Sequence, residues 1–356
     1  MTRSAQARID LSALRHNFQR VRRSAPASRV LAVIKANAYG HGMVRVAQAL
    51  DDADAFAVAR LDEALVLRGA GVVKPIVLLE GFSAADELAA LAQHNLETVV
   101  HHDFQIALLE QSRTHKPIPV WLKIDTGMHR LGIAPGNAAA AWNRLQACSA
   151  VTKPVRFMTH FANADLRDDA RNAAQIAQFT RALTGLPGER SSANSAAILS
   201  LPETHNEWVR PGIMLYGVSP FTNARAQDEE LRPVMTLTTQ LIAVNQHRKG
   251  DAVGYGGEWV CPEDMPVGVA AIGYGDGYPR HARAGTPVLV SGQRVPLISR
   301  VSMDMITLDL RGRFPLEIGA PVVLWGEGLP VEEIAECAGT IAYQLLCGVS
   351  ARVRSS

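Results

Sequence analysis

Polar side chains stand at the ends of several apolar runs of this sequence. The first is Lys35, at the end of the apolar run of residues 30–36. A lysine at the end of a buried strand is unfavourable unless it is paired or used covalently, because burial disfavours its charge. Other runs end with groups that can move protons or bind anions: Lys123 with Asp125, His160, Ser195 and Arg210. If these runs are parallel strands, their ends meet at one face and predict a single site there.

Two loops on that face could hold a phosphate. The NSAA segment offers the hydroxyl of Ser195, and the RPGIMLYG segment offers backbone N–H groups at Gly212 and Ile213 that no side chain at Gly212 obstructs. Barrels often bind phosphate with the loops after their last two strands. A lysine facing a phosphate cradle is what pyridoxal 5′-phosphate (PLP) requires, since it needs an amine for a Schiff base and an anchor for its ester.

The elements that would position these residues form a repeating pattern. Short apolar runs alternate with amphipathic segments such as residues 61–71 and 84–95. Nearly unbroken apolar runs are typical of parallel strands buried on both faces. Eight such units predict a (β/α)8 barrel of the TIM type. A doubly wound dinucleotide fold is the rival, but no G-x-G-x-x-G follows the first run. The runs span residues 30–36, 55–60, 75–81, 96–101, 119–127, 155–162, 189–195 and 206–212.

The pattern changes near Pro233. From there the chain alternates with period two and is rich in β-formers, and short turns such as Arg-Lys-Gly and Ser-Gly-Gln separate the stretches. No long helical segment occurs before VEEIAECAG. We therefore predict two packed domains, a barrel over residues 1–232 and a mainly β domain over residues 233–356.

Composition narrows the class of protein without naming a function. The chain has 356 residues, a formal net charge of +2, 47% hydrophobic residues and four cysteines. Near-neutral charge gives no reason to expect nucleic acid or a membrane surface as a partner. The N-terminus has no apolar signal region, and no metal-ligand spacing is present. We expect a cytoplasmic protein without a metal, whose four cysteines are small buried side chains.

A set of motifs then identifies a family. The segments AVIKANAYGHG, KIDTGMHRLG, MTHFANAD, NSAA, VRPGIMLYG, GYGG, GYGDGYPR and RVSMDM occur in this order along essentially the whole chain. The sequence resembles the alanine racemases, PLP enzymes of fold type III, and most closely their proteobacterial forms, including the catabolic one. The resemblance implies a PLP-holding barrel followed by a β domain, in agreement with the reading of the runs above.

The resemblance also implies roles around the cofactor. Lys35 matches the lysine that holds PLP covalently, and Arg210 matches the arginine that faces the pyridine nitrogen. Lys123 matches a lysine that is often carbamylated in the family, and His160 is expected to support the catalytic groups. The residues that match phosphate contacts are Tyr39, Ser195, Gly212, Ile213 and Tyr343.

A second group of residues is implied for the substrate. Arg130 matches the arginine that orients the cofactor and the substrate carboxylate. Tyr255 matches the second catalytic base, and the backbone N–H of Met303 matches a carboxylate contact; the partner subunit of a homodimer supplies both in the family. Racemisation of L-alanine and D-alanine needs a group on each face of Cα, which Lys35 and Tyr255 would provide. Supporting positions within the motifs are Asn194, Tyr274 and Asp304.

Other interpretations share parts of this pattern. A PLP-binding homeostasis protein would have the barrel and the lysine, but such proteins resemble the barrel alone. A broad-specificity amino-acid racemase or a decarboxylase could use the same scaffold, although Tyr255 and Arg210 disfavour the decarboxylase. His41, in the YGHG segment, is expected to be structural, and Tyr274 could be a turn residue. The chemistry would be the same for wall synthesis and for alanine catabolism.

Overall fold

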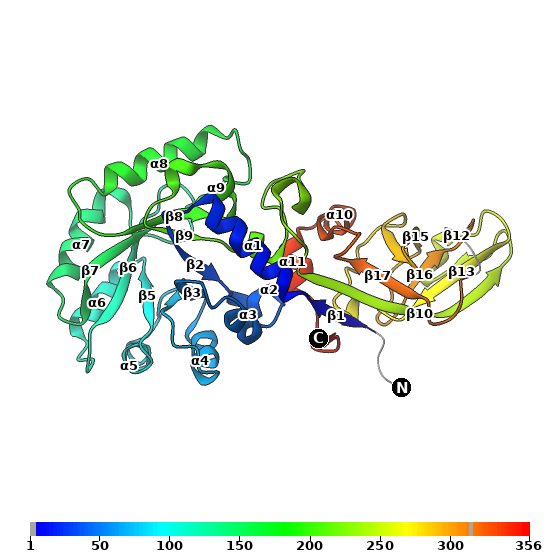
Figure 1. Cartoon of the computed structure of the whole chain (residues 1–356), viewed down its shortest axis with the longest axis horizontal. Helices are drawn as coiled ribbons and strands as arrows, with labels where there is room; N and C mark the ends of the chain where they lie inside the picture. Colours follow the sequence, from blue (N-terminus) through cyan, green and yellow to red (C-terminus); the bar gives the residue numbers. More distant parts are fainter. Residues whose placement is uncertain (1–4, 313–315) are drawn as a thin grey trace.

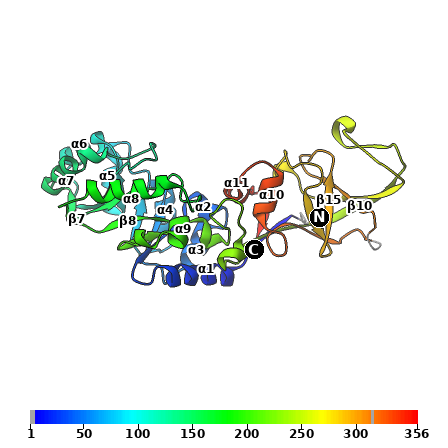
Figure 2. The same cartoon turned by 90° about the horizontal axis from the view of Figure 1, so that it is seen from above.

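The computed structural model describes residues 5–312 and 316–356. A barrel and a β domain lie side by side along the long axis of the molecule in both views (Figures 1 and 2). Helices α10 (Val331–Cys337) and α11 (Ala342–Cys347) lie between them in both views, and α11 packs against the segment that follows the first barrel strand. None of the helices in the described ranges is long and apolar enough to cross a membrane.

The barrel is the predicted (β/α)8 architecture, and its eight parallel strands close on one another. Each predicted apolar run overlaps one of them, and the strands at residues 55–58 and 97–100 are buried at every position, as both-face burial requires. The strands are β2 (Arg29–Val33), β3 (Ala55–Val58), β4 (Ile76–Leu78), β5 (Glu97–Val100), β6 (Ile118–Lys123), β7 (Val151–Met158), β8 (Arg190–Asn194) and β9 (Trp208–Arg210).

Helices surround these strands and bury their apolar stripes against them. The first begins after Asp10, whose carboxylate accepts hydrogen bonds from the N–H groups of Ser12 and Ala13 at 2.8 and 3.0 Å, and it buries Leu14 and Phe18. The helices are α1 (Leu11–Ser24), α3 (Met43–Ala49), α4 (Leu61–Gly69), α5 (Ala85–Gln93), α6 (Asp103–Gln111), α7 (Ala138–Ala147), α8 (Ala170–Ala182) and α9 (Ser195–Ser200).

The second domain is built from antiparallel strands, six of which hydrogen-bond in a closed cycle. The long strand β10 (Met235–His247) closes that cycle because it pairs with β17 near its start and with β13 near its end. The other strands are β13 (Met265–Ala270), β14 (Pro287–Val290), β15 (Gln293–Ile298), β16 (Ile306–Asp309) and β17 (Pro321–Trp325), with β11 (Ala252–Val253) and β12 (Trp259–Val260) as a separate pair.

The N-terminal strand differs from the prediction that residues 1–232 form the barrel. Strand β1 (Gln6–Ile9) pairs antiparallel with β10 and parallel with β18 (Arg354–Ser355), so it belongs to the sheet of the β domain. Its burial alternates strictly between exposed and buried positions. That pattern fits a sheet with one face covered, whereas barrel strands are buried on both faces.

The cysteines also differ in part from expectation. Cys148 and Cys261 are buried as predicted. Cys337 is half-buried and Cys347 is exposed, so the prediction of four buried side chains is wrong for these two. They are the last residues of α10 and α11, the two helices between the domains.

Candidate active site

A cavity of about 1120 Å³ opens at the carboxyl ends of the barrel strands. The strand ends β2, β6, β8 and β9 all contribute to it, which is the face where barrel enzymes carry their reactive groups. Eleven of the predicted site residues line it: Lys35, Tyr39, Lys123, Arg130, His160, Asn194, Ser195, Arg210, Gly212, Ile213 and Tyr343.

The loops after β8 and β9 form a cradle of hydrogen-bond donors. The hydroxyl of Ser195 accepts hydrogen bonds from the N–H groups of Gly212 at 2.8 Å and Met214 at 3.4 Å. Asn194 holds this loop, because its side chain caps α9 by accepting from the N–H of Ala197 at 3.0 Å. The converging hydroxyl and N–H groups form a site suited to a phosphate ester.

Gly212 keeps this cradle open. A Cβ at this position would lie 2.8 Å from the hydroxyl oxygen of Tyr39, so a side chain would collide with it. The ring of Tyr39 lies 6.0 Å from that of Tyr343, measured between centroids, and both residues line the cavity. Burial raises the pKa of Tyr39, and it raises the pKa of Tyr343 to about 12, so both hydroxyls remain donors at neutral pH.

Arg210 is held rigidly at the wall of the cavity. Its guanidinium donates to the hydroxyl of Ser191 at 2.7 Å, to the carbonyl of Thr159 at 2.5 Å and to the carbonyl of Ser192 at 3.3 Å. Burial lowers the pKa of Arg210 to about 10, which still leaves it protonated at neutral pH. It is therefore a fixed donor that does not release its proton.

His160 adjoins this arginine and is neutral. A long contact of 3.5 Å joins Nδ1 of His160 to the guanidinium of Arg210, and since the guanidinium can only donate, Nδ1 accepts and the hydrogen lies on Nε2. Burial and then the charge of Arg210 lower the pKa of His160 well below its usual range. The histidine can therefore relay hydrogen bonds without adding to the positive charge of the cavity.

Lys123 is buried among other cations. Burial, and then the charges of Arg210 and Arg130, lower its pKa to about 8. In the described part of the chain, Lys35, Lys123, Arg130 and Arg210 form no ion pair. This end of the barrel is therefore rich in positive charge that an anionic cofactor and an anionic substrate group could neutralise.

Asp125 has a structural task that the sequence did not reveal. Its Oδ1 accepts hydrogen bonds from the N–H groups of Gly127, Met128 and His129 at 3.0–3.1 Å. Those bonds fold the loop that carries Arg130 to the edge of the cavity. The carboxylate thus organises a turn, as aspartates commonly do, and Asp125 is not among the residues that line the cavity.

Sequence reasoning missed two residues of this region. The buried carboxylate of Glu332 accepts from the N–H groups of Ser219 and Ala226 at 3.1 and 3.0 Å, and so holds the segment that forms one wall. Cys347 also lines the cavity. Both lie in the C-terminal helices, and no local pattern indicates that these helices fold back onto the barrel.

Four predicted residues lie outside the cavity of their own chain: Tyr255, Tyr274, Met303 and Asp304. Tyr255 and Met303 are 69% and 52% exposed on the β domain. Tyr274 and Met303 belong to adjoining segments, since the N–H of Tyr274 donates to the carbonyl of Ser302 and the N–H of Gly275 to that of Met303. Asp304 forms an ion pair with Arg352. The structure therefore does not bring these four residues to Lys35 within one chain.

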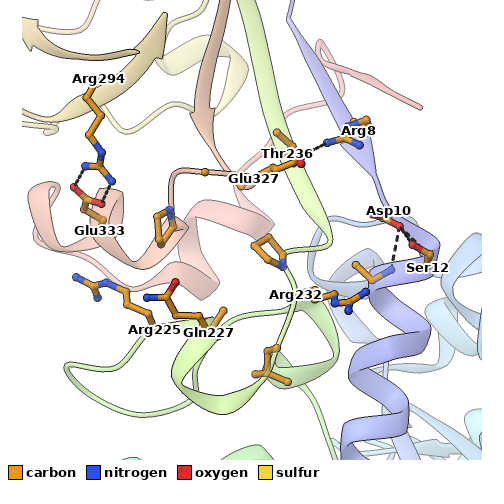
Figure 3. A pocket seen from close by; sticks show the side chains of 17 residues that line it. Arg8, Asp10, Ser12, Arg225, Gln227, Arg232, Thr236, Arg294, Glu327 and Glu333 are labelled. Atoms are coloured by element: carbon orange, nitrogen blue, oxygen red, sulfur yellow. Dashed lines mark hydrogen bonds and ion pairs between the residues drawn. The ribbon is translucent and has the colours of Figure 1, made fainter. Parts of the chain in front are cut away.

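A second cavity, of about 670 Å³, lies at the junction of the two domains (Figure 3). Three of its four arginines already pair with glutamates: Arg8 with Glu327, Arg225 with Glu336 and Arg294 with Glu333. Asp10 is occupied as the cap of α1. Among the described residues, no group of three or more metal-ligating side chains is present. The reactive groups therefore collect in the first cavity.

Comparisons with known proteins agree with this geometry. The family model "Alanine racemase, N-terminal domain" matches residues 9–220, and "Alanine racemase, C-terminal domain" matches residues 234–356. The chain belongs to the alanine racemase family. The resemblance found in the sequence is thereby confirmed, and with it the assignment to the isomerases.

Individual members of the alanine racemase family match along nearly their whole length. The chain is 56% identical to the alanine racemase of Nitrosococcus oceani, over 98% of each chain, and 53% identical to that of Aeromonas hydrophila, over 99% of this chain and 98% of the other. The biosynthetic alanine racemase of Pseudomonas aeruginosa has a TM-score of 0.96 at 44% identity, covering 99% of each chain. That of Bartonella henselae, solved with covalently bound pyridoxal phosphate, has a TM-score of 0.90 at 28% identity and the same coverage.

Proposed function

We propose that this protein is a PLP-dependent alanine racemase that interconverts L-alanine and D-alanine. The observation that carries the proposal is the presence, in one cavity, of a lysine at a strand end, a fixed arginine and a phosphate cradle. The named relatives at 56% and 53% identity support the substrate, and the Bartonella henselae structure with covalently bound pyridoxal phosphate supports the cofactor.

The residues present fit this cofactor. The cradle at Gly212 is one that a Cβ would fill, and its donors suit a phosphate. Lys35 would hold the cofactor by its amine, and Arg210 would donate to the pyridine nitrogen. When bound, PLP supplies an aldehyde carbon for an amine and a conjugated ring that withdraws electrons from the substrate. The phosphate would be held by the hydroxyls of Tyr39, Ser195 and Tyr343 and by the N–H groups of Gly212 and Ile213.

Two proton-transfer groups complete the proposal. Racemisation removes the Cα proton from one face and returns a proton to the other. We assign the proton of D-alanine to the amine of Lys35 and the proton of L-alanine to the hydroxyl of Tyr255. Arg130 and the backbone N–H of Met303 would orient the substrate carboxylate. Supporting roles are assigned to Lys123, His160, Asn194, Tyr274 and Asp304.

We propose a homodimer with shared active sites, because Tyr255 and Met303 lie outside the cavity of their own chain. In the dimer, Tyr255 of the partner subunit would close each cavity. Exposure of 69% for a tyrosine and 52% for a methionine on neighbouring parts of one domain supports a contact surface there. We expect the protein to act in the cytoplasm, and the four cysteines are free.

The primary test is an assay of the purified protein with L-alanine and PLP in D2O, following optical rotation and Cα deuteration. Loss of optical rotation together with deuteration is expected. Deuteration without a change in rotation would contradict racemisation. The absence of both would favour a PLP-binding protein without this chemistry. The same assay with L-serine and larger amino acids distinguishes a broad-specificity racemase.

Mixing two inactive variants tests the shared site. Lys35→Ala should lose the covalently held cofactor, whereas Tyr255→Ala should keep it and lose racemisation. In a mixed dimer, one site has both intact residues and the other has neither. An equimolar mixture with free subunit exchange should therefore recover about a quarter of the wild-type activity. If Tyr255 acted within its own chain, the mixture would remain inactive.

A further inference from the structure

The segment after Lys35 is a left-handed turn made of residues that rarely adopt this conformation. Ala36, Asn37, Ala38 and Tyr39 have φ angles of 52°, 52°, 55° and 52°. In L-residues other than glycine this region crowds Cβ against the backbone, and runs of such residues are exceptional. Four in succession persist only where the surrounding structure over-determines them, and such strain is typical of functional sites.

His41 holds the turn from inside. Its Nδ1 lies 3.0 Å from the carbonyl oxygen of Ala38 and 2.9 Å from that of Tyr39. Carbonyl oxygens can only accept, so Nδ1 carries the hydrogen, and burial, which lowers the pKa of His41 to about 4, keeps the ring neutral. Nε2 is buried without a partner among the described residues. A fully buried histidine with one unsatisfied nitrogen is energetically unfavourable. The hydrogen bonds that Nδ1 donates to the turn therefore explain why a histidine is buried at this position.

Three stacked rings support the turn from the side. The ring of Tyr216 lies between those of Tyr39 and His41, with centroid distances of 4.7 and 4.6 Å and interplanar angles of 29° in both pairs. The hydroxyl of Tyr216 donates to the carbonyl of Val33 at 2.9 Å. The stack therefore ties the turn to the strand that ends just before Lys35.

The conformation of this turn sets the directions of Lys35 and Tyr39, the two residues proposed above to bind the cofactor. Lys35 immediately precedes it, and Tyr39 is the last non-glycine residue in it. The hydroxyl of Tyr39 lies against Gly212, where it borders the phosphate cradle. At the adjoining Gly40, a Cβ would lie 2.2 Å from the carbonyl oxygen of Leu346, so helix α11 leaves the turn no room to relax outward.

We propose that His41 and Tyr216 are positioning residues of the cofactor site, which hold the left-handed turn and thereby aim the Lys35 amine and the Tyr39 hydroxyl. Neither residue lines the cavity, so both act through the turn. The inference rests on the proposed function, because the turn matters for chemistry only if Lys35 and Tyr39 hold PLP.

Two substitutions at His41 separate the donor from the ring, each tested as the PLP-loaded enzyme. His41→Phe keeps a ring for the stack and removes the N–H, whereas His41→Asn removes the ring and keeps an N–H near the position of Nδ1. We expect His41→Phe to release PLP about tenfold faster and to lower kcat about tenfold, with a much smaller change in KM, because one buried hydrogen-bonding group is lost. His41→Asn should recover most of the PLP retention.

Tyr216→Phe is the milder test, because it removes one hydroxyl and keeps the stack. PLP should leave this variant a few-fold faster, and the visible absorbance of the lysine-bound cofactor should shift its pH dependence relative to the wild type. If His41→Phe does not fold, the result with Tyr216→Phe decides the proposal by the same measurements.

Leu145→Ala is the matched control, since Leu145 is fully buried in α7 and remote from the turn. It should lower the Tm as much as the test variants do and leave PLP release, absorbance and kcat unchanged. If the His41 and Tyr216 variants behave like Leu145→Ala, the positioning role is wrong. If the wild-type chain neither retains PLP nor racemises alanine, the proposed function fails and the inference falls with it.

Discussion

The two ends of the β2–β9 barrel both carry cationic side chains, but the residues around these cations differ between the two ends. At the amino-terminal ends of the strands, Arg156 pairs with Glu97 at 2.7 Å and with Glu189 at 3.1 Å, and Arg29 pairs with Glu189. Two tryptophans complete this base cluster, Trp121 donating to Glu97 at 2.8 Å and Trp208 donating to Glu189 at 2.9 Å.

The carboxyl-terminal ends show the opposite arrangement. Lys123 and Arg210 are buried next to other cations, and the described chain offers them no paired carboxylate. Arg210 is satisfied by neutral groups, namely hydroxyl and carbonyl oxygens and Nδ1 of His160. The paired cations of the base cluster contribute to stability. The cations at the carboxyl ends have no paired carboxylate, so their charge is available to an anionic ligand. The same fold thus separates stability and chemistry between its two ends.

The largest expected effect is at the base cluster. Glu97→Ala removes a buried carboxylate and leaves the Trp121 N–H without its acceptor. Because Arg156 keeps Glu189 and is partly exposed, we expect a loss of about 3 kcal/mol in the free energy of unfolding, measured by urea denaturation. The kcat of the folded protein should change less than about twofold, since the base cluster does not reach the cavity. A fall in kcat that matches the loss of stability would break the distinction between the two ends.

Lys123→Met should increase the free energy of unfolding, whereas Glu97→Ala should decrease it. The pKa of Lys123 falls from its usual 10.5 to about 8 in the folded protein, so the unfolded chain binds more protons than the folded one between these values. Stability from this group therefore rises as the pH increases from about 8 to 10.5, and below pH 8 its charged form is destabilising. We expect the variant to gain on the order of 2–3 kcal/mol at pH 7.

The check for Lys123→Met is urea denaturation of the wild type and the variant in CO2-free buffer at pH 7 and pH 10. The stability difference between the two proteins should shrink at the higher pH, while the turnover of the variant falls. An equal difference at both pH values would show that Lys123 is compensated in the native protein, as the cations of the base cluster are.

A smaller effect is expected for Arg29→Lys in the base cluster. The guanidinium of Arg29 lies 4.2 Å from the ring centroid of Trp208 and pairs with Glu189. Lysine keeps the charge but loses the planar stacking surface and the fork of donors, so about 1 kcal/mol of stability should be lost. Thermal unfolding measures this loss, and an unchanged Tm would mean that charge alone matters in the cluster.

The smallest effect is expected at the domain junction. Arg8 and Glu327 form an ion pair there, but their side chains are 54% and 78% exposed. Arg8→Gln should change the free energy of unfolding by less than about 0.5 kcal/mol, because water and salt screen such pairs. Urea denaturation at low and high salt measures this change in the free energy of unfolding. A loss above 1 kcal/mol would show that this exposed pair stabilises the protein as the pairs of the base cluster do.

Barrel strands that are buried on both faces are easier to predict from the sequence than strands with exposed residues. Runs buried on both faces, such as residues 55–60, were located because apolar residues are continuous there. The predicted run at residues 155–162 begins too late, since β7 begins at Val151 and its next three residues are exposed and interrupt the apolar pattern. The site residues at strand ends could be found because parallel strands bring their ends together. Their roles remain predictions until they are tested by substitution.

By itself, the sequence determined the (β/α)8 barrel, the second β domain and the family, because each rests on local periodicity or on contiguous motifs. Only the tertiary structure decided that β1 joins the sheet of the β domain, that Cys347 reaches the cavity and that the residues after Lys35 form a left-handed turn. It also decided that Tyr255 lies outside the cavity of its own chain. These features depend on contacts between residues far apart in the sequence, such as Tyr216 with Val33, which are 183 positions apart, and local propensity does not encode such contacts.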